Sequence, residues 1–470
     1  MKNWFEVDKE GLKALQRGKP KTFIINELVQ NAWDENITFC KVDIRKISNS
    51  ELYITVIDDS PEGFKDIRHA YTLFADTYKR YDPEKRGRFN VGEKLVISIC
   101  NWAKVTTTKG TIMFNENGRD EFPDSTDSGS VIELSLPLEN EKEINELIRR
   151  AESLLPPRGI KYIVNDKEVL PKNMIWRLSA RLATEIQENN IMIRKNRTTN
   201  IDLIESDGQS WIYEMGIPIT KTDCKWHIDV QQKIPLTSDR ETVRPAFLQD
   251  LYAEVLNETH NKLTEDNVSD LWVRTGMKDD RIKKEAIDTI LNKRFGDKFL
   301  TRNPLDPNAN DEAVSRGYTL ISGSQMSAEE WGQAKKHDLI QSSSDLFGTA
   351  EMREALVRTP TPEQEKFIDF ATRLAKEFLG INIKVLFVEA KGSTTRADYN
   401  PLFKTLRFNL AHPNIPRFNN INWENLKLLY HELPHDEGNH TEHSYHDCIT
   451  TLAGKVTIKA LKDPKFFEVN

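Results

Sequence analysis

The stretch F-I-I-N-E-L-V-Q-N-A-W-D-E, residues 23–35, decides how the rest of the chain is interpreted. Its apolar residues recur at helical spacing: Ile24, Ile25, Leu28, Val29, Ala32 and Trp33. Glu27, Asn31 and Asp34 are four and three residues apart, so they lie above one another on the opposite face of the same helix. The pattern predicts a helix near residues 21–35 with one buried stripe and one polar stripe. In an isolated helix, such a polar stripe usually faces water.

Two turn-rich stretches follow this helix, each beside an apolar run. The strand-like residues 51–57 end in Asp58 and Asp59, and the turn that follows reaches Gly63. The second stretch, R-G-R-F-N-V-G-E-K at 86–94, is called the glycine loop below, and it runs directly into the apolar residues 95–100. Glycines before a helix let backbone N–H groups close around an anion. Further strands are predicted near 39–47, 102–108, 111–115 and 130–136, with helices near 92–100 and 141–154.

This order of helix, Asp-x-x-x-Gly turn, glycine loop and closing strand resembles the GHKL ATPases, a family that includes gyrase B, histidine kinases, the ninety-kilodalton heat-shock chaperone and MutL. The last two branches are the most similar. The resemblance implies that residues 1–171 form an ATP-binding domain. Its expected architecture is a two-layer α/β sandwich, a mixed sheet with helices on one face. ATP and Mg²⁺ are the implied ligands.

The resemblance also implies roles for individual residues. Glu27 is the expected general base toward the attacking water, and Asn31 the expected magnesium ligand. Asp59 is expected to accept a hydrogen bond from the adenine amino group; Asp58 is the alternative, because Pro61 stands where the family has a glycine. The other expected nucleotide contacts are Asp34, Gly63, Gly87, Asn90, Val91, Gly92 and Lys94, with residues 87–94 as a lid over the phosphates. Asn90 replaces a family glycine, and Asn tolerates positive φ better than most residues.

Residues 172–265 are expected to form a second, transducer-like α/β domain, with a strand over 211–218 and a helix over 247–262. In the family, such a domain sends a cation to the γ-phosphate. The stretch Asp239-Arg240-Glu241 looks similar to the one that carries this arginine in the chaperone relatives, and a guanidinium suits a phosphate. Arg240 is therefore the expected cation and Arg244 the alternative. A helix-capping role explains the same stretch equally well.

The remainder of the chain is expected to contain a helical and turn-rich linker over 266–360 and a last domain over 361–470. A helix over 278–299 is the clearest element of the linker region. In the last domain, the sequence predicts a helix over 363–379, strands over 381–389 and 406–410, and a helix from Trp423 that is capped by Asn422.

The helix from Trp423 carries the motif His431-Glu432-Leu433-Pro434-His435. Four-residue spacing places both imidazoles on one helix face, with Glu432 as a candidate base toward a metal-bound water. The pattern looks like that of the zincin metallopeptidases and predicts a Zn²⁺ site. His440 is the expected third ligand, with His443 and His446 as alternatives. Because Pro434 removes a helical hydrogen bond, the helix is expected to kink or to end early. A domain that binds metal without cleaving peptides is therefore the alternative.

Composition bounds the class of protein. At 470 residues the chain is too long for one ordinary hydrophobic core and predicts about three domains. Its 66 basic and 73 acidic residues give a net charge of −7, so no overall field favours nucleic acid, although a local basic groove stays open. Four widely spaced cysteines and the lack of a long apolar run predict a cytoplasmic protein with no membrane partner.

The expected protein is therefore an α+β multidomain ATPase with a metallopeptidase-like C-terminal domain. The resemblance implies that ATP closes the lid, joins the first two domains and promotes a homodimer, and that hydrolysis releases these contacts. It also implies a protein client, whose identity the sequence does not give. The alternative is a nucleotide-gated scaffold or chaperone-like binding protein with an inactive peptidase-like domain. Such a scaffold would keep Asp59 and the lid without needing Glu27.

Overall fold

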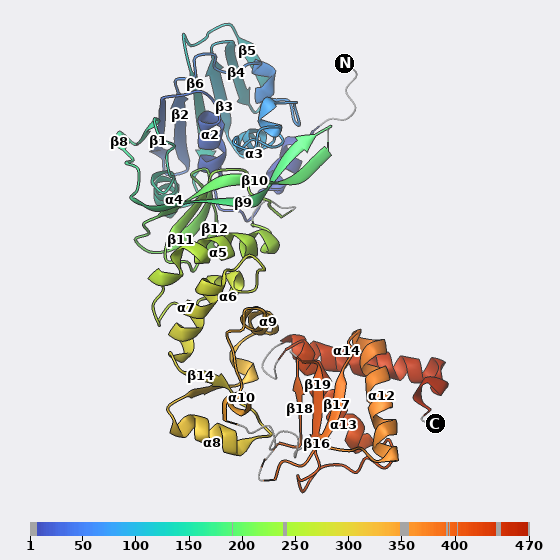
Figure 1. Cartoon of the computed structure of the whole chain (residues 1–470). Coiled ribbons are helices and arrows are strands. Elements are labelled where there is room, and N and C mark those ends of the chain that lie inside the picture. The colour runs from blue at the N-terminus through green and yellow to red at the C-terminus, as the bar shows by residue number, and fades with distance from the viewer. Residues whose placement is uncertain are drawn as a thin grey trace. The chain divides into compact units, whose positions relative to one another are not determined.

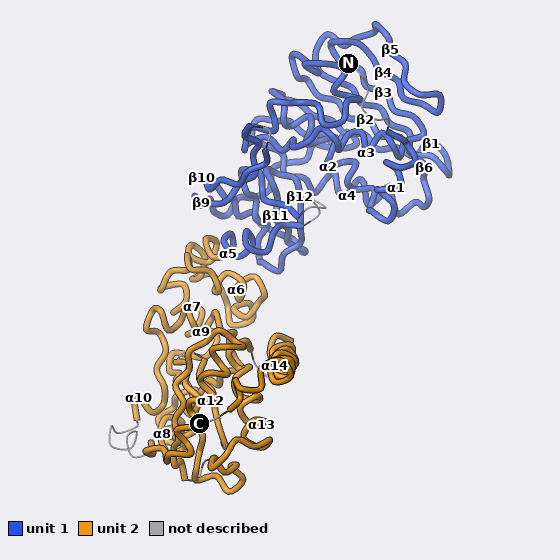
Figure 2. Tube along the Cα trace, turned by 90° about the vertical axis from the view of Figure 1, so that its right-hand side faces the viewer, with its two compact units in different colours: residues 1–251 blue, residues 252–470 orange. Residues whose placement is uncertain are grey.

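The structure is a computed structural model that describes residues 7–189, 191–237, 242–347, 357–391, 393, 395–401, 403–438 and 443–468. The chain divides into two compact units, residues 1–251 and 252–470, and each is described by itself (Figure 2). Both units contain helices together with parallel and antiparallel strand pairs, so the predicted α+β class is confirmed. The four predicted domain ranges stay predictions, since a division at residue 251 does not test them.

The first sheet of unit 1 has eight strands in the order β5-β4-β3-β6-β2-β1-β7-β8 (Figure 1). The strands are β1 (Phe39–Ser48), β2 (Glu51–Asp58), β3 (Trp102–Thr107), β4 (Gly110–Asn115), β5 (Gly118–Phe122), β6 (Ser130–Pro137), β7 (Lys161–Val164) and β8 (Lys167–Glu168). Because β1 pairs with β2 antiparallel and with β7 in parallel, the sheet is mixed, as predicted. The alternating patterns predict β1 to β4 and β6, whereas β5, β7 and β8 are too short or too polar to be predicted.

Helices pack against one face of this sheet. They are α2 (Phe23–Trp33), which contacts β1 and β2, and α4 (Glu141–Glu152), which contacts β1 (Figure 1). The short helix α3 (Gly92–Ser98) lies between α2 and α1 (Lys9–Ala14) and contacts both. In β2, Leu52, Ile54 and Val56 are buried and the intervening residues are half-buried. This alternation is typical of a sheet with one covered face. The apolar stripe of α2 is buried as predicted, which leaves Glu27 and Asn31 on the other side of the helix.

The second sheet of unit 1 has the order β12-β11-β13-β10-β9. Its strands are β9 (Met174–Glu188), β10 (Ile191–Ile204), β11 (Ser210–Glu214), β12 (Ile217–Thr222) and β13 (His227–Val230), and α5 (Pro245–Thr259) follows. The single strand predicted over 211–218 is wrong, because the chain reverses at Met215 and Gly216, which have φ of 48° and 88°. A Cβ at Gly216 would lie 2.1 Å from the Leu155 carbonyl oxygen, so this turn needs glycine.

Unit 2 begins within α5, and short elements then occupy most of the expected linker. They are α6 (Leu271–Gly276), α7 (Lys284–Phe295), β14 (Phe299–Thr301), α8 (Pro307–Ser315), β15 (Thr319–Ile321), α9 (Ala328–Lys336) and α10 (Ser343–Phe347). The helix predicted over 278–299 is shorter at both ends, since α7 begins at Lys284 and Gly296, with φ of 87°, follows its last residue. β14 and β15 pair in parallel, so the turn-rich sequence folds into regular structure rather than an extended linker.

The C-terminal part of unit 2 has a four-stranded sheet in the order β16-β17-β19-β18. Its elements are β16 (Val357–Arg358), α12 (Pro362–Leu379), β17 (Lys384–Val388), β18 (Ala397–Asn400), β19 (Thr405–Asn409), α13 (Trp423–Glu432) and α14 (His443–Lys462). Asn422 caps α13 as predicted, by accepting hydrogen bonds from the Glu424 and Asn425 amides. The α-helix ends at Glu432 and continues as a 3₁₀ turn over Leu433–Asp436, as expected from Pro434.

None of the described helices combines the length and the apolar character needed to cross a bilayer.

Candidate functional site

A cavity of about 710 Å³ lies beside α2 in unit 1. Its walls come from α2, the ends of β2 and β6, the glycine loop and the strands β11 and β12. The predicted site residues that line it are Glu27, Asn31, Gly63, Gly87, Asn90, Val91 and Gly92. Asp34, Asp59 and Lys94 are described, but they lie outside this lining. The fold thus brings most of the predicted site together from three separate stretches of sequence.

Glu27 lies against the beginning of α3. Its Oε2 accepts a hydrogen bond of 2.6 Å from Gln30 Nε2, one turn further along α2. A Cβ added to Gly92 would lie only 1.7 Å from the same Glu27 oxygen. The absence of a side chain at residue 92 therefore lets the glycine loop reach the candidate base, and any larger residue would displace one of the two.

The two neighbouring carboxylates at the end of β2 have different surroundings. Asp58 lines the cavity, and its Oδ1 accepts a 2.9 Å hydrogen bond from the Ser60 amide. Burial raises the pKa of Asp58 to about 6, against the lowering effect of the Ser60 and Ser130 amides. Because Leu52, Ile54 and Val56 face the helices, strand alternation puts Asp58 on that same face. This alternation is the sequence signal that could have chosen Asp58 over Asp59.

The Asp59 carboxylate is hydrogen-bonded to the residues at the start of β1. Its carboxylate accepts hydrogen bonds from the Thr38 amide at 2.9 Å, the Thr38 hydroxyl at 2.5 Å and the Phe39 amide at 3.0 Å. Although partial burial opposes it, these bonds lower the pKa of Asp59. The structure therefore gives Asp59 a role in fixing the start of β1, away from the cavity that it was expected to serve.

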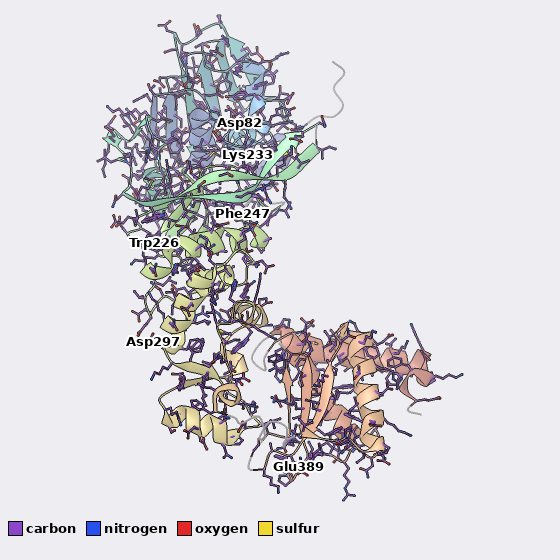
Figure 3. All side chains as sticks on the ribbon, in the orientation of Figure 1. Asp82, Trp226, Lys233, Phe247, Asp297 and Glu389 are labelled. Carbon is purple, nitrogen blue, oxygen red and sulfur yellow. The ribbon has the colours of Figure 1, made fainter. Side chains whose placement is uncertain are left out.

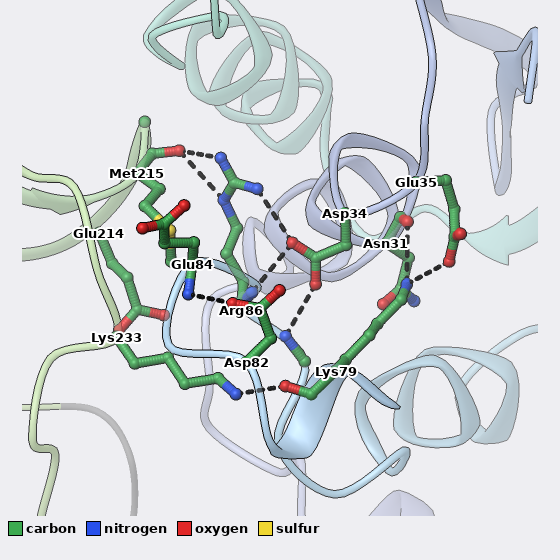
Figure 4. A network of polar contacts seen from close by, with 12 residues as sticks. Asn31, Asp34, Glu35, Lys79, Asp82, Glu84, Arg86, Glu214, Met215 and Lys233 are labelled. Atoms are coloured by element: carbon green, nitrogen blue, oxygen red, sulfur yellow. Dashed lines mark hydrogen bonds and ion pairs between the residues drawn. The ribbon is translucent and has the colours of Figure 1, made fainter. Parts of the chain in front are cut away.

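Asp34 holds the glycine loop instead of facing the cavity. Its fully buried carboxylate accepts hydrogen bonds from the Arg86 amide at 2.9 Å, from Arg86 Nη1 at 3.0 Å and from the Gly87 amide at 2.8 Å (Figure 4). Burial alone would raise the pKa of Asp34, but Lys79, Arg86 and the two amides lower it below its ordinary value. The third residue of the predicted polar stripe is thus an anchor for the loop.

Asn90 and Lys94 both turn toward η1 (Ile67–Ala70). Asn90 adopts φ of 54°, as its place in a family glycine position predicts, and its amide donates to the His69 carbonyl at 3.2 Å and the Thr72 carbonyl at 2.8 Å. The Lys94 ammonium donates to the His69 carbonyl and lies 3.4 Å from Glu93 Oε2. Burial lowers the pKa of Lys94. These contacts stabilise the glycine loop against the segment between β2 and α3.

The cation expected from the second sheet stays a prediction at its first choice, Arg240. Arg240 lies outside the described residues. Arg244 borders a separate cavity of about 520 Å³, where its Nε donates to the Leu236 carbonyl at 2.8 Å. Lys233, which the sequence reasoning missed, is completely buried, and its Nζ donates to the Lys79 carbonyl at 2.5 Å.

Lys233 lies close to the segment that carries Asp82, as Figure 3 shows, and its amide donates to the Pro83 carbonyl at 2.8 Å. Burial and the nearby Arg88 lower the pKa of Lys233 to about 8. Lys233 lies just after β13, which ends at Val230, and only Gln231 and Gln232 separate the two. A lysine after a strand carries no local signal of function, which is why it was missed.

Two further features of the cavity bear on what it could bind. Asn26 Oδ1 is buried on its wall and accepts no hydrogen bond from the described residues. Gly63 has φ of 55°, and a Cβ there would lie 3.0 Å from the Thr108 amide nitrogen, so the turn after Asp59 also needs glycine. Carboxylate, amide oxygen and exposed loop backbone are the groups that recognise an amine, a hard cation and phosphate oxygens.

In the C-terminal part of unit 2, the rings of His431 and His435 lie 5.8 Å apart between centroids. The Tyr445 hydroxyl lies 3.2 Å from His431 Nδ1, and its ring lies 4.7 Å from that of His435. His435 Nδ1 lies 3.2 Å from the Gly438 carbonyl oxygen. Burial raises the pKa of Glu432 to about 8, and the nearby Asp398 adds to the effect.

His440 lies outside the described residues, so its expected role as third ligand stays a prediction. Within the described ranges, no three His, Cys, Asp or Glu side chains are grouped in a way that would hold a metal ion. His443 and His446 belong to the first turn of α14, the helix that also carries Tyr445.

No protein-family model and no curated protein matches this chain. Among solved structures, the chain is similar to the ATPase region of topoisomerase II from Saccharomyces cerevisiae, with 14% identity over 48% of this chain and 78% of that chain and a TM-score of 0.32. It is also similar to the N-terminal domain of a DNA repair protein, with 12% identity over 50% of this chain and 91% of that chain and a TM-score of 0.32.

Proposed function

We propose that residues 1–251 bind Mg-ATP in the cavity beside α2 and hydrolyse it, as the resemblance of the sequence to the GHKL ATPases implies. The observation that carries this proposal is that Glu27, Asn31, Asp58 and the glycine loop line one cavity. A cavity with a few convergent polar groups and a carboxyl of raised pKa is the usual form of an active site.

Each residue has a role that suits its chemistry. We assign the reading of adenine to Asp58 instead of Asp59, because a carboxylate on the cavity wall can accept the adenine amino group, whereas guanine presents a carbonyl oxygen there. Asn31 supplies the kind of oxygen that Mg²⁺ prefers, and the ion neutralises charge on the phosphates when bound. Glu27 would accept the proton of the attacking water, with Gln30 and Gly92 fixing its position.

We assign to Lys233 the role of the second-sheet cation that was expected at Arg240. In its favour, its buried ammonium lies on the Lys79 and Arg80 carbonyls, and Lys79 lines the cavity. A short movement would exchange these carbonyl oxygens for phosphate oxygens, which attract a cation more strongly. In this proposal ATP draws the second sheet and the glycine loop together, promotes homodimer contact and acts on a protein client, in a cytoplasmic compartment where the four free cysteines stay reduced.

Titration calorimetry and phosphate-release assays on the whole chain test this function. We expect one ATP per chain to bind in the presence of Mg²⁺, GTP to bind at least ~10-fold more weakly, and ATP to be hydrolysed at a measurable rate. Binding without hydrolysis would favour the nucleotide-gated scaffold. No binding of ATP would contradict the proposal.

We further propose that His431 and His435 hold a Zn²⁺ ion together with a third ligand, for which His440 is the first choice. The observation in favour is that the two imidazoles lie beside each other, on a segment whose helix α13 packs against the edge strand β18. If His435 Nδ1–H donates to the Gly438 carbonyl, Nε2 carries the lone pair that a metal needs.

Glu432 is then a candidate base, and an edge strand can align an extended peptide for cleavage. Elemental analysis of protein purified without chelators, compared with a His431→Ala/His435→Ala variant, tests the metal site. About one zinc per chain that the variant lacks would support it. Protein that stays metal-free after zinc is added would contradict it.

A further inference from the structure

Arg88 of the glycine loop is anchored on the second sheet of unit 1. It donates from Nη1 to Glu214 Oε1 at 2.8 Å and from Nη2 to Glu214 Oε2 at 2.5 Å, so the two side chains form a bidentate pair. Arg88 Nη2 also donates to the Ile234 carbonyl at 2.8 Å, while the Ile234 amide donates to Glu214 Oε2 at 2.6 Å. The side chains of Arg88 and Glu214 are only 9% and 3% exposed.

A second anchor lies two residues earlier in the loop. Arg86 donates from Nε to the Met215 carbonyl at 3.0 Å, and from Nη1 to Asp34 at 3.0 Å, so it joins the turn after β11 to the end of α2 (Figure 4). Between the two arginines, a Cβ at Gly87 would lie 2.9 Å from Lys79 Cδ. Residues 86–88 are therefore held by Asp34 at the end of α2 and by the second sheet.

This anchor is close to the candidate base along the chain. Only residues 89–91 separate Arg88 from Gly92, the residue whose Cα packs against the Glu27 carboxylate. A displacement of Arg88 would therefore be passed to Gly92, and from there to Glu27. Losses of this kind matter because a misplacement of about 1 Å can lower a reaction rate by ~100-fold.

We infer that Glu214 is a positioning residue of the ATPase reaction, which acts through Arg88 to hold the glycine loop against Glu27. This inference rests on the proposed function and extends it to a residue of the second sheet. A buried ion pair is weak evidence for stability, because well-packed apolar residues often stabilise a fold as well. A bidentate pair does fix the relative position of the two segments that it joins, and this is the property that catalysis requires here.

The test compares Glu214→Gln with Asp202→Asn. Asp202 belongs to a similar bidentate pair, with Arg177 at 2.5 and 2.6 Å, but both partners lie within the second sheet and neither lines the cavity. Steady-state ATP hydrolysis gives kcat and KM, melting temperatures report folding, and hydrogen exchange of residues 86–94 in nucleotide-free protein reports the loop.

We expect Glu214→Gln to lower kcat by at least ~10-fold, to change KM by less than about threefold and to speed exchange of the glycine loop. Asp202→Asn should leave kcat and the hydrogen exchange of the loop at wild-type values, even if its melting temperature falls as far as that of Glu214→Gln. If Glu214→Gln does not fold, Arg88→Lys replaces it, since it keeps the charge and loses the bidentate geometry. Glu214→Asp keeps the carboxylate, so its kcat should lie between those of Glu214→Gln and the wild-type chain.

Two failures can be told apart. A wild-type chain that hydrolyses ATP, with kcat within twofold in Glu214→Gln or Arg88→Lys, refutes the positioning role and leaves the proposed function intact. A wild-type chain that neither binds nor hydrolyses ATP refutes the proposed function, whatever the exchange of the loop shows. Equal losses of kcat in Glu214→Gln and Asp202→Asn would also refute the positioning role, because they would trace to general destabilisation.

Discussion

Replacing each of the two aspartates at the end of β2 by asparagine should have opposite effects on stability and on ATP affinity. In nucleotide-free protein, burial raises the pKa of Asp58 to about 6, so the ionised carboxylate is less stable in the fold than in water. The difference from an ordinary value of about 3.9 corresponds to about 3 kcal/mol, and exposure of this half-buried side chain to solvent reduces that to about 1–3 kcal/mol. Asp58→Asn removes this cost and should therefore stabilise the free protein.

The pH dependence of this stabilisation has a definite sign. A carboxyl with a raised folded pKa contributes no penalty below its unfolded pKa, and the penalty grows as the pH rises through about 6. Asp58→Asn should raise the melting temperature at pH 8, by roughly 2–4 °C for each kcal/mol, and change it little at pH 4. The same variant should weaken ATP binding by about 1–3 kcal/mol, because it loses the charged acceptor for adenine.

Asp59→Asn should behave in the reverse way. Its carboxylate accepts three hydrogen bonds from Thr38 and Phe39, so its loss should destabilise the protein by about 1–2 kcal/mol and leave the affinity for ATP unchanged. Thermal melting and titration calorimetry give the melting temperature and the dissociation constant for ATP of each variant. An Asp59→Asn variant that loses ATP affinity while Asp58→Asn keeps it would refute the assignment of Asp58.

The remaining predictions concern the loop, the base and the metal. Glu27→Gln should bind ATP and hydrolyse it at least ~100-fold more slowly in a phosphate-release assay. Gly92→Ala should lower kcat by ~10-fold or more, because its Cβ would lie 1.7 Å from Glu27 Oε2. Asp34→Asn should destabilise the chain by about 3 kcal/mol at pH 7 in denaturant titrations, since it leaves Arg86 buried without its carboxylate. Because the folded pKa of Asp34 is lowered, this difference from wild type should shrink below about pH 4. A His431→Ala/His435→Ala variant should lack the zinc that the wild-type chain retains.

The chain offers a matched control for Gly92→Ala, and each of the other variants has an outcome that would contradict its role. Gly332→Ala lies inside α9 with open space around its Cβ, so it should leave kcat unchanged and stabilise the helix by up to about 1 kcal/mol. Equal activity of Gly92→Ala and Gly332→Ala would contradict the contact with Glu27. Wild-type turnover by Glu27→Gln would make Glu27 part of an ordinary solvated helix face. An Asp34→Asn variant as stable as wild type at pH 7 would contradict its role as the anchor of the loop.

Local periodicity was enough to predict the elements that build the site. The apolar stripe of α2 and the alternation in β2 are properties of neighbouring residues, and both elements lie within two residues of their predicted ends. The strand predicted over 211–218 failed because Met215 adopts positive φ, which its side chain does not suggest. The helix predicted over 278–299 failed at Gly296, where the signal for a helix end was present in the sequence.

Roles that depend on distant partners could not be predicted. Asp34 appeared to belong to the nucleotide site because it shares a face with Glu27, but its partner Arg86 lies 52 residues away and turns it into an anchor. Lys233 becomes notable only because the fold buries it on the Lys79 carbonyl, 154 residues away in the sequence. Asp58 is the exception, since the alternation of β2 already pointed its side chain toward the helices.

A crystal structure of the chain with Mg²⁺ and a nonhydrolysable ATP analogue tests the central claim most directly. The account predicts that the adenine amino group lies within hydrogen-bond distance of Asp58, that Asn31 faces the metal ion, and that the phosphates lie along residues 87–92 with Glu27 beside the terminal phosphate. An analogue bound elsewhere on the chain, or bound in this cavity with its adenine away from Asp58 and its phosphates away from the glycine loop, would contradict it.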